Sequence, residues 1–404
     1  MDPKPVLQLP PNTSQLSIID MHTYGMPTRV LTSGYPPLHG TLLDQKSQAE
    51  QTHDTIRKQI LHEPRSHADA FGAIFCPQTE HTETGEAHMG VLYIHGHGYS
   101  TMCGHATLAV ARVLIDTWDL NIFPQRKEVR YDPERRSVDL VLHTPGGLVD
   151  VRVPTVEGGR RSDPSRLIRF MALPAYAVAT GIEVDIPEGR RWDGLGGRRG
   201  VTVSLAYCGT FILQVQVGEL MGVWSLRVGE EGGVDLSGLQ HATAQLKGLI
   251  NADSRYREYL RVPGGGGYGS VFGVMVTDKS QGTAAEGTKG AELGIYFFGG
   301  GHIDRSPTGS AAAARVALDV ARGNLAVGES WTYHSLTTHM FGLEGMVATV
   351  LEVGGTGEDG GGLCGPVKVQ VAGNAYYTGY STIIKEDGDI LGEKGFLLGD
   401  LTRK

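Results

Sequence analysis

Two short segments hold the residue types with which this chain could do chemistry. The run MCGHAT at 102–107 places Cys103 directly before a long apolar, alanine-rich stretch, and the run DRSPTGS at 304–310 places Thr308 before a similar one. Both stretches are typical of helices, so each residue is predicted to stand at a helix N-terminus. A cysteine in that position has a lowered pKa, which makes its thiolate available as a base or a nucleophile.

Threonine at the matching position gives a different chemistry. Its hydroxyl donates and accepts hydrogen bonds, but it does not readily take a proton from carbon. If the two helices point at one another, their N-termini offer unpaired N–H groups and two positive dipole ends, which suit a bound anion such as a substrate carboxylate. We therefore expect a small anionic ligand between Cys103 and Thr308.

The elements that must position these residues are two related halves. Aligned on Cys103 and Thr308, the segments share Gly104 with Gly309 and Ala106 with Ala311, at an offset close to half of the 404 residues. This spacing favours an internal duplication, although two unrelated alanine-rich helices remain an alternative. Both helices are apolar on nearly all sides, so each is predicted to run through the middle of its own domain with strands around it.

The rest of the chain reads mainly as short strands separated by glycine. Glycine makes up 58 of 404 residues, about twice the average share, which argues against a helical bundle. The predicted strands include VDLVLHT, GLVDVRVPT, RGVTVSLAY, TFILQVQVG, SVFGVMVTD, GIYFFGG and PVKVQVAG. We expect an α+β protein with two pseudo-symmetric domains and the active site in the cleft between them. The predicted divisions are a flexible arm at 1–15, a first domain at 16–180 and a second at 181–374.

Charge and composition limit the classes of molecule that this protein is expected to bind. The formal net charge is −8 and no basic run is interleaved with aromatic residues, so no nucleic acid or membrane partner is expected. The proline-rich N-terminus lacks the pattern of a signal peptide, which favours a cytoplasmic location. The four cysteines match no metal or redox spacing, and Cys76, Cys208 and Cys364 are interpreted as structural. A small molecule is the expected partner.

The two motifs resemble those of the proline racemase family, whose usual forms are MCGHG and DRSPCGTG. Supporting similarities follow in order through about residues 16–398: IDMHTYGMPTRV, EPRSHADAFGA, MALPAYA, SLAYCGTF, WTYHSLTTHMFGLE and YYTGYSTIIKEDGDILGEKGF. The resemblance implies a diaminopimelate epimerase-like fold, with each largely antiparallel, barrel-like sheet around its helix. It also implies that the C-terminal strands of about 375–404 return to the first domain, and that the protein is a homodimer.

Family members with cysteine in both motifs are racemases or epimerases that use two thiols. Threonine at 308 instead resembles the relatives that dehydrate trans-3-hydroxy-L-proline to Δ1-pyrroline-2-carboxylate. The resemblance implies that Cys103 removes the Cα proton without any cofactor, and that Thr308 hydrogen-bonds the departing hydroxyl or only fills the cysteine site. A single-thiolate proline or hydroxyproline racemase remains the alternative, and a binding protein without catalysis is a third possibility that should also have lost Cys103.

The remaining candidate residues surround these two. Backbone N–H groups of Gly104 and His105 on one side, and of Gly309 and Ser310 on the other, are expected to bind the carboxylate. Asp304 is expected to bind the ring ammonium, and His97 to line the pocket.

Two other patterns are set aside. His95-Gly-His97 has a spacing that can bind metal, but no further ligands accompany it, so no metal site is expected. Gly264–Gly269 satisfies a dinucleotide-binding pattern, but it precedes a strand rather than a helix and is interpreted as a loop.

Overall fold

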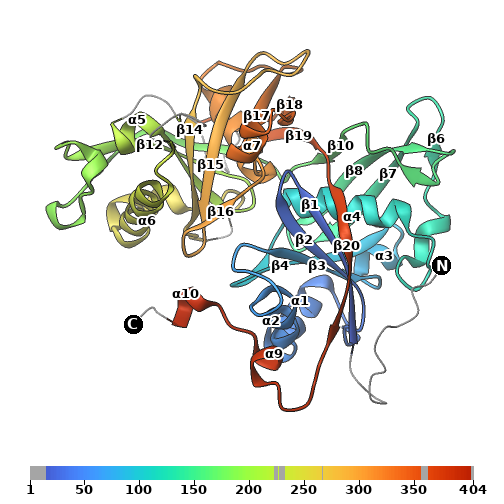
Figure 1. Ribbon diagram of the computed structural model, residues 1–404. Coiled ribbons are helices and arrows are strands. Elements are labelled where there is room, and N and C mark those ends of the chain that lie inside the picture. Colours follow the sequence, from blue (N-terminus) through green and yellow to red (C-terminus); the bar gives the residue numbers. More distant parts are fainter. Residues whose placement is uncertain (1–14, 223–225, 227–232, 266, 356–362, 402–404) are drawn as a thin grey trace.

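The computed structural model describes residues 15–222, 226, 233–265, 267–355 and 363–401, and the predicted flexible arm lies outside this part of the chain except for Gln15. Figure 1 shows two lobes, one built from the first part of the chain together with the segment from β20 onward, and one built from the residues between. In the described residues, no helix combines the length and hydropathy needed to span a bilayer.

The strands of the first lobe form one half-sheet. Hydrogen-bonded neighbours follow in the order β20 (Tyr376–Ile384), β1 (Gln15–Thr23), β2 (Met26–Ser33), β3 (Phe71–Cys76), β4 (Met89–His95), β7 (Ser137–Thr144), β8 (Gly147–Val156) and β10 (Ile168–Met171). Neighbours are antiparallel except at β2 with β3 and β4 with β7.

The second lobe repeats this pattern strand for strand. Its order is β11 (Tyr176–Asp185), β12 (Gly200–Tyr207), β13 (Phe211–Gln216), β14 (Val271–Asp278), β15 (Ala291–Phe298), β17 (Ser330–His334), β18 (Met346–Val353) and β19 (Val367–Gly373). The parallel pairs are β13 with β14 and β15 with β17, at the places equivalent to those of the first lobe. The predicted pseudo-symmetry is therefore confirmed, and β10 joins the two half-sheets by pairing with β19.

The two predicted central helices form as expected. They are α4 (Gly104–Asp116) and α7 (Gly309–Ala321), and nearly every side chain along both is buried. The strands of each lobe pack around its own helix, as Figure 1 shows. Gly323, with a φ of 73°, follows the last turn of α7 in the left-handed conformation that commonly ends a helix.

Two pairs of helices are additions at equivalent points of the repeat. Between β2 and β3 the chain forms α1 (Leu42–Thr52) and α2 (Asp54–Leu61), and between β13 and β14 it forms α5 (Val217–Met221) and α6 (Leu236–Ala252). Shorter helices are α3 (Glu80–Glu83), α8 (Leu336–Met340), α9 (Ile390–Lys394) and α10 (Leu398–Leu401). Sequence analysis did not identify these elements.

Short strands lead from each half-sheet into its helix. β5 (Gly98–Ser100) turns back on β4 before α4, and β16 (His302–Asp304) turns back on β15 before α7. The remaining strands are β6 (Tyr131–Asp132) and β9 (Arg161–Ser162). The first hairpin is closed by two residues and the second by three, but each turns back antiparallel on the strand before it and leads into its helix, so the two motifs lie at equivalent places, one on each lobe.

Candidate active site

The N-termini of the two central helices meet at a pair of glycines. A Cβ added to Gly104 would lie 3.0 Å from the Cα of Gly309, and one added to Gly309 would lie 3.2 Å from the Cα of Gly104. The ring of Phe170 closes on both positions, at 3.1 Å and 2.8 Å. A side chain larger than hydrogen would push the helices apart, so glycine is required here for close approach.

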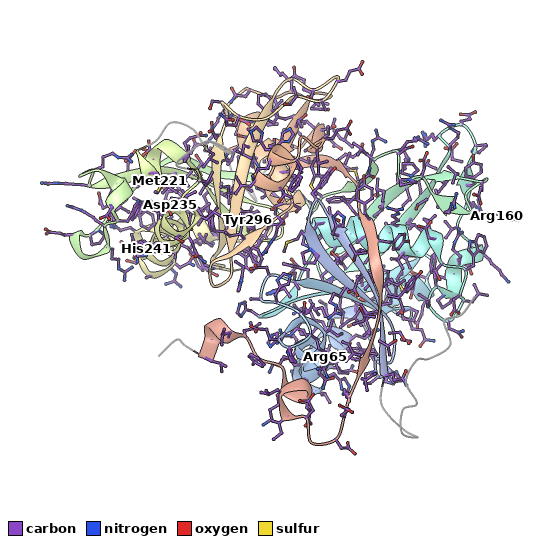
Figure 2. All side chains as sticks on the ribbon, viewed as in Figure 1. Arg65, Arg160, Met221, Asp235, His241 and Tyr296 are labelled. Atoms are coloured by element: carbon purple, nitrogen blue, oxygen red, sulfur yellow. The ribbon has the colours of Figure 1, made fainter. Side chains whose placement is uncertain are left out.

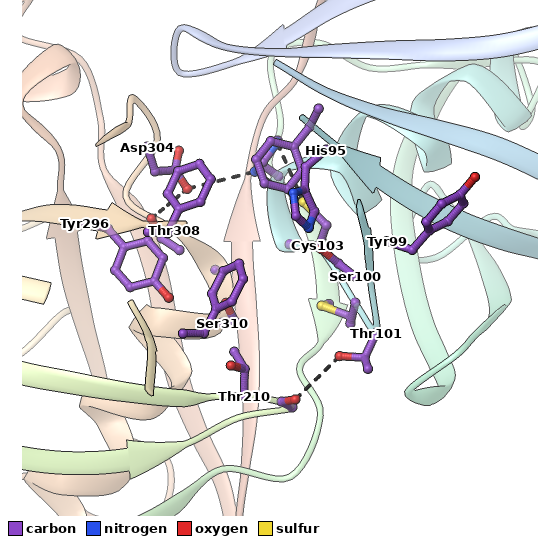
Figure 3. A pocket seen from close by; sticks show the side chains of 18 residues that line it. His95, Tyr99, Ser100, Thr101, Cys103, Thr210, Tyr296, Asp304, Thr308 and Ser310 are labelled. Atoms are coloured by element: carbon purple, nitrogen blue, oxygen red, sulfur yellow. Dashed lines mark hydrogen bonds and ion pairs between the residues drawn. The ribbon is translucent and has the colours of Figure 1, made fainter. Parts of the chain in front are cut away.

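A cavity of about 230 Å³ opens beside this junction. Pockets that hold drug-sized ligands usually measure about 300–1,000 Å³, so this one suits a smaller molecule. It is lined from both lobes, and all the predicted site residues except His97 face it: Cys103, Gly104, His105, Asp304, Thr308, Gly309 and Ser310 (Figure 3).

A chain of polar contacts connects the two motifs across the pocket. The Sγ of Cys103 lies 3.4 Å from Nδ1 of His105, which lies 4.0 Å from Oδ2 of Asp304. The hydroxyl of Thr308 donates to the same Oδ2 at 2.7 Å. Asp304 is held by the amide and hydroxyl of Ser306, which both donate to Oδ1 at 2.8 Å. Thiol, imidazole, carboxylate and hydroxyl thus form one connected set.

Thr308 has an unusual backbone conformation. Its φ is 62°, in the left-handed region that a β-branched residue rarely adopts. The bond from its hydroxyl to Asp304, together with the bond of 3.2 Å from its amide to the Ser306 hydroxyl, holds it in this conformation. Such strain is concentrated at functional sites, where the surroundings maintain it.

The predicted lowering of the Cys103 pKa is wrong. Burial raises the pKa of the thiol, and the negative charge of Asp304 acts in the same direction. The backbone N–H groups of Ala106 and His105 oppose this rise without overcoming it. The helix N-terminus lies where the sequence predicts it. Burial nevertheless destabilises the thiolate by more than the helix N-terminus stabilises it.

Burial also keeps the nearby imidazoles neutral. It lowers the pKa of His105, with Asp304 opposing the shift, and it lowers the pKa of His95 to about 4. The pKa of Tyr296 is raised by burial, with the charge of Asp304 adding to the rise. At neutral pH, His105 is therefore a neutral ring beside Cys103, able to accept a proton.

An aromatic wall lines the pocket, and sequence analysis did not assign it. Phe71 contacts the ring of His105 edge to face at 4.8 Å, and Phe298 stacks on Tyr296 with ring centroids 6.0 Å apart. Phe272 stacks on Phe298 at 6.1 Å. The alternation along β15 could have revealed part of this wall, because residues two apart share a face of a strand.

His97 lies outside the pocket, at a contact between the lobes. Its Nε2 is 2.6 Å from Nε2 of His302, whose Nδ1 is 2.7 Å from Oδ1 of Asp69. Arg305 forms an ion pair of 2.6 Å with the other oxygen of Asp69. The predicted place of His97 in the pocket lining is therefore corrected, because β5 turns back before α4 begins and leaves this residue at the lobe boundary.

Comparison with known proteins shows the family and supports the fold. A sequence model described as proline racemase matches residues 18–397. A trans-L-3-hydroxyproline dehydratase of Mus musculus is 34% identical over 97% of this chain and 98% of its own, and the proline racemase of Clostridioides difficile is 26% identical over 94% and 100%. A crystal structure of a hydroxyproline epimerase from Agrobacterium vitis superposes with a TM-score of 0.71 at 19% identity, over 96% of both chains. This chain belongs to the proline racemase family.

Proposed function

We propose that the protein is a cofactor-independent hydro-lyase that converts trans-3-hydroxy-L-proline to Δ1-pyrroline-2-carboxylate. The observation that carries the proposal is the hydroxyl of Thr308, bonded to Asp304 on the opposite side of the pocket from Cys103. A second thiol is absent at that position, so a proton can be removed at Cys103 but not returned by a thiol partner. Relatives at 33–34% identity from Mus musculus and Homo sapiens are named for this dehydration.

The paired helix N-termini would bind the substrate carboxylate. The first N–H groups of α4 and α7 have no partner within their own helices, and those of Gly104, His105, Gly309 and Ser310 border the pocket. As the Cα proton leaves, negative charge spreads onto the carboxylate, and fixed N–H dipoles in a buried site stabilise that charge. Asp304 would bind the ring ammonium and set the orientation of the ring.

The raised pKa of Cys103 requires a way to form the thiolate, and His105 supplies one. We propose that the thiol proton passes to His105 over the 3.4 Å contact, giving a thiolate and an imidazolium. Burial opposes this transfer at both groups, because it raises the pKa of Cys103 and lowers the pKa of His105. The transfer therefore depends on the charge of Asp304, which stabilises the imidazolium, and on the substrate ammonium, which stabilises the thiolate. The thiolate then takes the Cα proton and becomes a thiol again.

The departing hydroxyl needs a proton in the same step. In trans-3-hydroxy-L-proline the 3-hydroxyl lies on the same face of the ring as the Cα hydrogen, so it leaves on the Cys103 side, where the imidazolium of His105 holds the proton. Thr308 would fill the place of the second thiol on the opposite face. The Cα electron pair forms the carbon–carbon double bond, the carbon–oxygen bond breaks, and hydroxide leaves with this proton as water. The enamine then tautomerises to the cyclic imine. Cys103 and His105 end in their starting protonation states.

The alternative is a racemase or epimerase that works with one thiolate and a water molecule. One experiment separates the two activities: purified protein is given trans-3-hydroxy-L-proline and the product mass is measured. Loss of one water supports the dehydratase. An unchanged mass with inverted configuration at Cα would establish the isomerase instead.

The role of Cys103 is tested with Cys103→Ser. General base catalysis contributes about 10²–10⁴-fold, so we expect kcat to fall by that amount while the melting temperature stays close to that of the wild type. Cys208→Ser is a matched control, because Cys208 is also a buried free cysteine but lies outside the pocket lining. Retained activity in Cys103→Ser would exclude the thiolate mechanism.

A further inference from the structure

A second group of chemically active side chains lies in the first lobe, away from the pocket. Glu80 and His81 belong to the short helix α3, and His143 is near the end of β7. Each offers one atom that can bind a metal, and these atoms lie within 4.8 Å of one another. Oε1 of Glu80 is 3.9 Å from Nε2 of His143, and the two imidazole rings meet edge to face with centroids 4.5 Å apart.

Each of the three side chains is oriented by a second contact that leaves a ligand atom available. Nδ1 of His143 lies 3.0 Å from the hydroxyl oxygen of Thr79, so its Nε2 faces Glu80. Nδ1 of His81 is 2.7 Å from Oε2 of Glu86, which leaves Nε2 of that ring. Metal-binding histidines almost always have their other nitrogen held in this way, by a carboxylate or another oxygen.

Glu80 is oriented in the same manner. Its Oε2 accepts the amide N–H of Leu42 at 2.8 Å, and its Oε1 is the atom turned toward His143. The side chain of His143 is 7% exposed, whereas those of Glu80 and His81 are 39% and 36% exposed. One ligand is therefore fixed in the protein, and two at the surface can close on an ion.

We infer that Glu80, His81 and His143 form a binding site for a divalent transition-metal ion, Zn²⁺ above all. Two imidazoles with one carboxylate are a common zinc ligand set, with a fourth position left for water. Ligand atoms about 2.0–2.2 Å from one zinc ion lie about 3.3 Å apart, so small rotations of the two exposed side chains complete the site.

The site is separate from the active-site pocket. In the β4 and β7 pairing, Gly90 lies opposite His143, while His95 at the other end of β4 lines the pocket. Five residues of strand span roughly 17 Å. A bound ion would join α3 to β7 and, through Leu42, to the start of α1, so its role would be to stabilise this end of the lobe.

The test is a Zn²⁺ titration of the chelator-treated, dialysed full chain carrying Cys103→Ser, against a competing chromophoric chelator. The substitution removes the thiol of Cys103, which could otherwise bind zinc. We expect the Cys103→Ser protein to bind Zn²⁺ tightly, and Zn²⁺ to raise its melting temperature. One equivalent of the bound Zn²⁺ should be lost in His81→Gln and in His143→Gln. Zn²⁺ bound elsewhere, for example between His97 and His302, should still bind in these variants. Comparison of each variant's isotherm with that of its parent therefore isolates the equivalent bound at the proposed site.

Two further variants make the result specific. Glu86→Gln changes only the group that orients His81, and loss of such a contact weakens metal binding by about 10–100-fold. His241→Gln is the matched control, because His241 is exposed on α6 of the other lobe (Figure 2) and should leave binding unchanged.

The outcome that overturns the proposal is equally defined. If the Cys103→Ser protein binds no stoichiometric Zn²⁺, or if the isotherm of His81→Gln is the same as that of its parent, no such site exists. His81 is partly exposed, so this substitution does not threaten folding. For His143→Gln, a circular dichroism spectrum and a melting curve without metal show whether a loss of binding is only a loss of fold.

Discussion

A single methyl group at the junction of the two helices should reduce activity much more than stability. In Gly104→Ala the new Cβ would lie 3.0 Å from the Cα of Gly309 and 3.1 Å from Cζ of Phe170. Neither neighbour can turn away, since one is helix backbone and the other is a ring only 1% exposed. Overpacking a core lowers the free energy of unfolding by about 1–3 kcal/mol. Replacing glycine by alanine in a helix raises it by about 1 kcal/mol.

The net loss in the free energy of unfolding should therefore be about 0–2 kcal/mol. The effect on catalysis follows from geometry, because the strain is relieved by separating the N-termini that would hold the carboxylate. A displacement of about 1 Å can reduce the rate by about 10²-fold, so kcat/KM for trans-3-hydroxy-L-proline should fall by about 10–100-fold. Gly309→Ala should have the larger effect, since its Cβ would lie only 2.8 Å from Phe170.

The assay pairs urea unfolding with steady-state kinetics on the same preparations. Gly248→Ala is the matched control: Gly248 lies within α6, and the nearest atom to its new Cβ is 4.0 Å away. This variant should gain about 0.5–1 kcal/mol and keep its activity. If Gly104→Ala and Gly309→Ala instead gain stability as Gly248→Ala does and keep kcat/KM within twofold, close contact between the helices does not govern catalysis.

Three further predictions follow from other parts of the structure. Thr308→Cys should raise exchange of the proline Cα proton with deuterated solvent and lower dehydration, and no change in either would mean that position 308 does not face the substrate. Because burial lowers the pKa of His95 from 6.5 to about 4, the unfolded chain binds a proton between these values that the folded chain does not. The free energy of unfolding should then fall by about 3 kcal/mol as the pH drops from about 6.5 to about 4. His95→Asn retains an acceptor for the His97 amide, and it should reduce this dependence on pH in a series of urea-unfolding measurements. A variant with the same pH dependence as the wild type would contradict the assignment to His95. Arg315→Met should cost about 3–5 kcal/mol, because the Glu292 carboxylate, 2.8 Å from Nε of Arg315 and fully buried, would lose its ion-pair partner; adding Glu292→Met should restore most of that loss, and equal stability of the single and double variants would argue against it.

The sequence predicted the repeat because both central helices carry their pattern locally. A run of small and apolar residues after Cys103 and after Thr308 is enough to specify a buried helix, and the strand pairing around each confirms it. The pocket residues next to the motifs were identified for the same reason. The division into domains, the homodimer and the cytoplasmic location remain predictions.

The local sequence pattern could not predict contacts between residues that are far apart in the sequence. The pKa of Cys103 depends on burial by strands and by the opposite lobe, so the helix N-terminus alone gave the wrong direction. His97 was placed in the pocket because it precedes the first motif closely, but its contact with His302 depends on how the lobes meet. Phe170, whose ring packs against Gly104 and Gly309, lies on β10, which is distant from both motifs in the sequence.

The pairing of β20 with β1 has a consequence for how the protein is made. In the second lobe the equivalent outer strand, β11, directly precedes β12, whereas the first lobe receives its outer strand from the last part of the chain. The edge of β1 therefore has no partner in the position of β20 while the ribosome is still translating the second lobe, and unpaired edges favour aggregation. The first lobe is completed only after residues 376–384 are made, so a chain that stops before residue 376 lacks part of its first lobe even though every residue lining the candidate active-site pocket has been made.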